Sequence, residues 1–127
     1  MTLTAKLFLI LGGFNAALAV MLGAFGAHAL KVRVSTEMLV VYQTGVQYHF
    51  YHALGLVLVG LAITQLPESV PLKWYGGLML AGIVLFSGSL YGLSLSELRW
   101  LGAVAPFGGT AFIAAWVLFV IAVIKAH

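Results

Sequence analysis

The sequence contains no cysteine, only three acidic residues, and 7% charged residues in a chain of 127. Without cysteine the chain forms no disulfide, thiolate metal site, thiol nucleophile or covalent c-type haem link. A soluble domain carries about a quarter charged residues, so this chain has too few charges to cover a surface that faces water. The scarcity of charge therefore indicates a protein whose natural solvent is the lipid bilayer.

The six lysines and arginines give a net charge of +3, but they stand singly at the borders of apolar segments. They form no basic cluster that would hold a nucleic acid or a patch of anionic lipid, so we expect no nucleic-acid partner. Membrane orientation follows the side with more Lys and Arg in its short loops. Three basic residues fall on each side, and the sequence predicts no orientation.

What the sequence has in abundance is hydrophobic residues, which make up 63% of it. A helix needs about 20 apolar residues to cross the hydrocarbon of a bilayer. The pattern predicts one all-α integral membrane domain, residues 1–127, in which four transmembrane helices form an up-down bundle. The predicted spans cover approximately residues 7–30, 44–66, 74–95 and 101–124.

The first span also resembles a secretory signal peptide, with Lys6 before the apolar stretch and AHA at 27–29 as a cleavage site. Its apolar stretch runs past about 20 residues, longer than the apolar region of a signal peptide. We therefore favour a membrane span.

Polar residues are concentrated in QTGVQYHFYHALG, residues 43–55, where the second predicted span begins. After His52 the apolar run covers only about 14 residues, or about 21 Å of helix, too short to cross. The span must therefore include the polar residues before it, and we expect these in or just under the lipid headgroups. Ser35 as N-cap and Glu37 in the first turn predict a short interfacial helix, approximately 35–43, that runs into this span.

Antiparallel connections bring the end of the first span, the start of the second, the end of the third and the start of the fourth to one side of the membrane. The other half offers little that is polar beyond Asn15. The candidate ligand-binding residues on the polar side are His28, Gln47, His49, Tyr51, His52, Ser87, Tyr91 and Thr110. Since buried polar groups in hydrocarbon need partners, we expect them to bond across helices and to present a small polar cavity.

Four stretches carry a family resemblance: GAFGAHAL at 23–30, TGVQYHFYHALGL at 44–56, LFSGSLYGL at 85–93 and APFGGTAFIAAW at 105–116. They resemble the domain-of-unknown-function 423 family, small multi-pass membrane proteins of bacteria with a related transmembrane protein in animal mitochondria. The resemblance implies a four-span helical protein of the bacterial inner membrane, and it implies no reaction. The family-pattern positions are His28, Gln47, His49, His52, Ser87, Gly88, Tyr91, Pro106 and Gly108.

The polar cluster admits several interpretations. His28, His49 and His52 offer imidazoles for zinc, copper or a haem iron, but no carboxylate lies in the spans to orient such a ligand. Histidines also serve in proton or solute paths, and a pocket of Tyr, His and Gln suits a quinone or a lipid. The remaining interpretation is a polar core that sets helix packing.

Catalysis has little support, because no acid accompanies the Ser–His combinations and the glycine pairs at 12–13, 76–77 and 108–109 follow no phosphate-loop pattern. We expect those glycines to pack helices, as do the small-residue stripes Ala19–Gly23–Ala27 and Gly88–Gly92. The sequence thus predicts a structural or interaction component without a cofactor. Its expected partners are the bilayer, a second copy of itself and other membrane proteins. The alternative is a binder or transporter of a small ligand.

Overall fold

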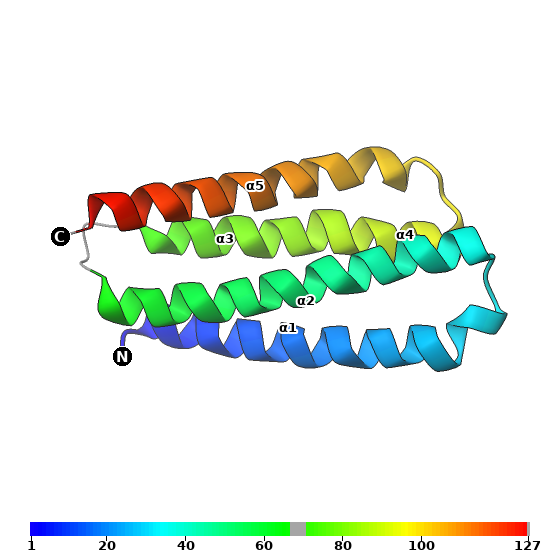
Figure 1. Ribbon diagram of the computed structural model, residues 1–127, viewed down its shortest axis with the longest axis horizontal. Helices are drawn as coiled ribbons and strands as arrows, with labels where there is room; N and C mark the ends of the chain where they lie inside the picture. The colour runs from blue at the N-terminus through cyan, green and yellow to red at the C-terminus, as the bar shows by residue number, and fades with distance from the viewer. Residues whose placement is uncertain (67–70, 127) are drawn as a thin grey trace.

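The structure, a computed structural model, describes residues 1–66 and 71–126. Within these ranges it is helical and contains no strand. The elements are α1 (Leu3–His28), the 3₁₀ turn η1 (Leu30–Val32), α2 (Thr36–Gln65), α3 (Leu72–Gly82), the π-helical segment η2 (Ile83–Ser87), α4 (Gly88–Ser96) and α5 (Leu101–Lys125). Because α3, η2 and α4 form one continuous rod, the described residues make four helices long and apolar enough to cross a membrane. The predicted four-helix, up-down arrangement is confirmed (Figure 1).

The start of α2 follows the sequence signals for a helix N-terminus. The Ser35 Oγ accepts a hydrogen bond from the Met38 backbone N–H at 3.1 Å, and Glu37 lies in the first turn. The interfacial helix expected over 35–43 is not a separate element, because residues 36–43 form the first turns of α2. This one helix of 30 residues is about 45 Å long.

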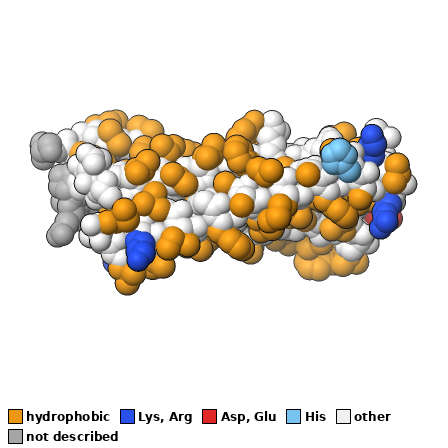
Figure 2. Space-filling model, turned by 90° about the horizontal axis from the view of Figure 1, so that it is seen from below, with side chains coloured by type: hydrophobic (Ala, Val, Ile, Leu, Met, Phe, Trp, Pro, Cys, Tyr) orange, Lys and Arg blue, Asp and Glu red, His pale blue; other side chains and the backbone are white. Residues whose placement is uncertain are grey.

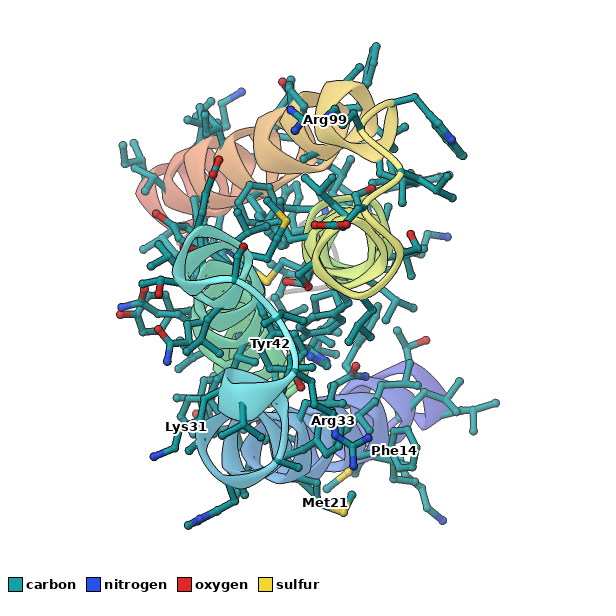
Figure 3. The ribbon with its side chains drawn as sticks, turned by 90° about the vertical axis from the view of Figure 1, so that its right-hand side faces the viewer. Phe14, Met21, Lys31, Arg33, Tyr42 and Arg99 are labelled. Carbon is teal, nitrogen blue, oxygen red and sulfur yellow. The ribbon has the colours of Figure 1, made fainter. Side chains whose placement is uncertain are left out.

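The bundle consists of two antiparallel hairpins. The first is α1 packed along α2, and the second is α5 packed along the α3–η2–α4 rod. Helix α2 contacts α3, η2 and α4 and so joins the hairpins, while α1 and α5 lie at opposite outer positions (Figures 1 and 3). Orange hydrophobic side chains cover most of the face in Figure 2, with Lys and Arg at its two ends, as a bilayer requires.

Glycines let neighbouring helices approach closely, but only one glycine of each adjacent pair lies at such a contact. A Cβ on Gly12 would lie 2.8 Å from the Ala53 carbonyl oxygen of α2, whereas a Cβ on Gly13 would meet nothing within 4 Å. Gly76 likewise lies against the Phe8 ring, and Gly77 is open. The expectation that both glycines of a pair pack helices is therefore half correct.

The third pair has the same asymmetry and explains how α5 reaches the rod. The backbone of α5 at Gly108 lies directly against Leu85 and Phe86 in η2, whereas Gly109 has only the Phe86 ring nearby, at 3.8 Å. A π-helical segment inserts an extra residue into a helix, and such segments often mark functional sites. Here the backbone of η2 contacts Gly108, the one glycine of α5 at which an added Cβ would collide.

The apolar and polar parts of the core occupy different lengths of the bundle. Large side chains such as Leu56, Val59, Met79 and Phe112 fill the apolar core between α2, α3 and α5. The buried polar residues are Asn15, His49, His52, Ser87, Ser89 and Ser94. In α2, all the buried residues that follow His52 are apolar or glycine. Buried polarity is thus concentrated in one part of the bundle, but it includes Asn15, which the sequence places in the other half.

Candidate functional site

His49 is the centre of a chain of hydrogen bonds that joins three helices. The Asn15 side-chain N–H donates to the Leu11 carbonyl at 2.8 Å, which turns the Asn15 Oδ1 toward His49. The His49 Nε2–H donates to that oxygen at 2.9 Å. For a neutral His49 the Nδ1 then accepts from the Tyr91 hydroxyl at 2.8 Å. All three donors point from α4 through α2 toward α1, an arrangement in which the bonds polarise one another.

His52 has the opposite tautomer. Its Nδ1–H donates to the Tyr48 carbonyl at 2.7 Å, because a carbonyl only accepts. Its Nε2 accepts from the Trp116 indole N–H at 3.0 Å, because an indole only donates. The ring also stacks on Phe112 with centroids 3.4 Å apart. Both nitrogens of His52 are therefore engaged, and α2 is tied to α5.

Two further bonds bind neighbours to α2. The Ser87 hydroxyl donates to the Gly45 carbonyl at 2.8 Å, and the Tyr42 hydroxyl donates to the Leu22 carbonyl at 2.6 Å. Among the described residues, no buried side-chain nitrogen or oxygen lacks a hydrogen-bond partner. Such full satisfaction is typical of a polar core that specifies packing.

The network lies deeper in the bundle than the sequence predicts. His49 stands near the middle of α2 (Thr36–Gln65), about 20 Å from its start. Its partner Asn15 stands near the middle of α1 (Leu3–His28). The cluster is thus near the centre of the bundle and not at the end of a span, because α2 begins at Thr36 and adds about two turns ahead of Gln43, the first residue of the polar stretch.

The candidate residues divide into two groups. His49, His52, Ser87 and Tyr91 meet inside the bundle. His28, Gln47, Tyr51 and Thr110 are exposed. Gln47 does not reach Ser87 or Tyr91, since its amide donates to the Tyr51 hydroxyl at 2.7 Å on the outside of α2. Thr110 donates to the Pro106 carbonyl of its own helix at 2.8 Å.

The three histidines considered for a metal are not brought together. His28 ends α1, thirteen residues beyond Asn15, or about 20 Å along the helix from the His49 contact. Among the residues that the structure describes, no group of three His, Cys, Asp or Glu side chains is placed to hold a metal ion. Ser87 donates to a backbone carbonyl and His52 has no free nitrogen, so the two form no Ser–His pair.

An open hollow does exist beside the network, and we call it the aromatic groove. It has a volume of about 420 Å³ and lies between α2 and α5 over η2. Its lining residues are Tyr48, His52, Phe86, Gly109, Phe112, Ile113 and Trp116. The sequence predicts a polar cavity, but this lining is mainly aromatic, because the polar side chains nearby are used in bonds between helices.

Three participants in the network are not among the residues predicted from the sequence: Asn15, Trp116 and Tyr42. Asn15 carried a usable signal, since it is the one asparagine of the chain and stands in the middle of an apolar span. Trp116 and Tyr42 carried little, because aromatic residues in a membrane protein are ordinarily assigned to the interface.

Comparison with known proteins agrees with this architecture. A sequence profile of the family described as protein of unknown function DUF423 matches residues 22–109. The UPF0382 membrane protein YwdK of Bacillus subtilis is 52% identical over 120 residues, which cover 94% of this chain and 98% of that protein. The UPF0382 membrane protein SERP0230 of Staphylococcus epidermidis is 45% identical over 94% of this chain and 97% of its own. No solved structure matches significantly. The chain belongs to the DUF423 (UPF0382) family of membrane proteins, as its motifs predict.

Proposed function

We propose that the protein is a non-catalytic structural and interaction component of the bacterial cytoplasmic membrane, and that it associates with a second copy of itself through the outward face of α2. The observation that carries the proposal is a polar stripe on that face. Gln43, Gln47 and Tyr51 are exposed and follow one another at i, i+4 and i+8.

The stripe lies where polar side chains are costly. Gln47 is about 17 Å and Tyr51 about 23 Å from the start of α2 (Thr36–Gln65), well inside a hydrocarbon layer of about 30 Å. Their mutual bond, 2.7 Å long, uses one donor of Gln47 and leaves its amide oxygen for a further bond. A second transmembrane helix would cover these groups and bond to them.

A second copy suits the stripe because glutamine is both donor and acceptor. Two α2 helices related by a two-fold axis would set the Gln47 amides opposite each other, and each would complete the other's hydrogen bonds. The buried network supports the same proposal, since its full satisfaction fits a scaffold better than a reacting centre.

Cysteine cross-linking tests the association directly, because the natural chain has no cysteine. We expect Gln43→Cys, one turn from Gln47 on the same exposed stripe, to give a disulfide-linked dimer on oxidation in native membranes. The matched control is Phe14→Cys on the outward face of α1, 64% exposed (Figure 3), which should stay monomeric. A Gln43→Cys protein that remains monomeric, or that links only to a different protein, would overturn the self-association.

The non-catalytic part has its own test. We expect protein purified in mild detergent to carry neither a stoichiometric metal nor a visible chromophore. A metal or haem that is present in the natural protein and lost in His52→Ala would contradict the proposal and make the buried network a cofactor site.

A further inference from the structure

A second hollow, which we call the charged pocket, opens at the end of the bundle where α2 starts and α4 ends. It has a volume of about 220 Å³. Its lining residues are Glu37, Met38, Val41, Leu93, Glu97 and Arg99. Two of the three acidic residues of the whole chain therefore face one small pocket together with a guanidinium.

The charged pocket and the aromatic groove lie along one side of the molecule. On α2 the lining residues Met38, Val41, Tyr48 and His52 follow at spacings of three, seven and four residues, which keep them on a single helix face. The opposite wall runs from Arg99, just before α5 (Figure 3), to α5 itself. The floor comes from the α3–η2–α4 rod, through Leu93 in one hollow and Phe86 in the other.

The separation of the two hollows matches the dimensions of a lipid leaflet. From Glu37 to Tyr48 is 11 residues of α2, or about 17 Å. Half of the hydrocarbon thickness is about 15 Å. A phospholipid in its normal orientation, with its headgroup in the charged pocket, would therefore reach the aromatic groove with an acyl chain. We propose that this side of the protein holds one phospholipid with an ethanolamine-type headgroup, which carries both a phosphate and a primary ammonium.

The charges of the pocket select this headgroup. Arg99 offers a fork of N–H donors to the phosphate, and the carboxylates of Glu37 and Glu97 offer acceptors to the ammonium. A headgroup with a phosphate alone would face two carboxylates and one guanidinium. A choline headgroup has the positive charge but no N–H to donate.

Glu97 itself supports a bound cation. It ends α4 in a left-handed conformation with φ of 57°, where glycine or asparagine is usual. It also adds a negative charge to a helix C-terminus, which the helix dipole disfavours. An ammonium beside the carboxylate offsets the second of these effects.

The groove supplies the apolar half of the site. Its lining is mainly aromatic and it opens on the outside of the bundle, and most polar groups nearby are used within the protein. Gly109 on its wall has room for a side chain, since a Cβ there would come no closer than 3.8 Å to Phe86. A larger residue at this position would fill the space that the acyl chain needs.

Native mass spectrometry of the full chain tests the proposal. The protein is reconstituted in nanodiscs of equimolar palmitoyl-oleoyl phosphatidylethanolamine, phosphatidylglycerol and phosphatidylcholine, released, and the retained lipids are counted. We expect one phosphatidylethanolamine per chain, preferred about fivefold over either other lipid, the effect of one or two partly exposed ion pairs. No retained lipid, or equal retention of all three, would overturn the proposal.

Variants separate the two parts of the site. Glu37→Gln with Glu97→Gln should abolish the headgroup preference, and Arg99→Gln should lower retention of all three lipids. Lys31→Gln removes a positive charge at the same end of the bundle, outside the pocket (Figure 3), and should retain the natural pattern. Gly109→Leu should reduce the bound lipid, whereas Gly77→Leu, at an open glycine outside the groove, should not. A double glutamate variant that still prefers phosphatidylethanolamine would overturn the headgroup assignment. The test is independent of self-association, because it counts lipids per chain.

Discussion

Trp116 donates its indole N–H to the Nε2 of His52 at 3.0 Å, and this bond joins α5 to α2 beside the stacked rings of His52 and Phe112. It fixes His52 as the Nδ1–H tautomer. His49, one helical turn earlier, is fixed as the Nε2–H tautomer by Asn15. Two histidines of the same helix thus hold their protons on opposite nitrogens.

The opposite tautomers are directly observable. In protein labelled with ¹⁵N-histidine, we expect two buried neutral imidazoles, one protonated at Nδ1 and one at Nε2. The nitrogen chemical shifts distinguish a protonated from an unprotonated ring nitrogen. Trp116→Phe should release the His52 tautomer and leave the His49 signals in place. Finding the same tautomer at both positions in the natural protein would contradict the hydrogen-bond directions described above.

The Trp116 bond also has an energetic consequence. Trp116→Phe keeps an aromatic ring but leaves the His52 Nε2 without its donor, and we expect a loss of about 1 kcal/mol in the free energy of unfolding. The control is Trp74→Phe, because Trp74 is 65% exposed near the end of the bundle. Unfolding in mixed micelles measures both. Equal effects of the two variants would show that the bond contributes nothing.

Asn15 and His49 should be energetically coupled. Asn15→Leu leaves the His49 Nε2–H buried without an acceptor, at a cost of about 1–3 kcal/mol. His49→Leu carries a cost of its own, and the double variant should be less destabilised than the sum by about 0.5–2 kcal/mol. A double-mutant cycle on the free energy of unfolding gives this coupling. Strict additivity would contradict the contact.

The first glycine pair offers a test with opposite signs. Gly12→Ala would press a methyl group against the Ala53 carbonyl and the Val57 N–H of α2, and we expect a loss of about 1–3 kcal/mol. Gly13→Ala meets no neighbour and should be neutral or stabilising by up to about 1 kcal/mol, since alanine favours helix. Thermal unfolding of both variants measures the difference in stability. A Gly12→Ala protein as stable as Gly13→Ala would refute the close approach of α1 to α2.

The pair at 108–109 tests the contact of α5 with the π-helical segment. Gly108→Ala should destabilise the protein by at least as much as Gly12→Ala. Its methyl group would meet backbone atoms of η2, which cannot rotate away as the end of a side chain can. Gly109→Ala should be tolerated, with its Cβ 3.8 Å from the Phe86 ring. Comparable stability of the two variants would mean that α5 does not rest on η2 at this point.

Much of the fold was predictable because hydropathy decides it. Four apolar stretches give four helices, short connections give antiparallel neighbours, and Ser35 gives the start of α2. The position of the polar residues along their helix was not predictable from hydropathy. The polar residues around His49 resemble the border of a span, and only the continuous helix from Thr36 places them near its middle.

The candidate site was half predictable, for a reason that helical phase alone does not reveal. His49, His52, Ser87 and Tyr91 face inward as expected. Gln47 belongs to the same polar stretch but points outward to Tyr51. The direction of a face depends on where the neighbouring helices sit, and that in turn depends on close contacts such as Gly108 on η2.

The two-hairpin architecture has a consequence for biosynthesis. When α1 and α2 leave the ribosome they lack Tyr91, Ser87 and Trp116, so His49, the Gly45 carbonyl and His52 face lipid with incomplete hydrogen bonding. The buried faces of the amino-terminal half therefore have their hydrogen-bond partners in the carboxy-terminal half. Co-expression of residues 1–66 and 71–127 as separate chains should reconstitute the bundle, because side-chain hydrogen bonds join the two halves.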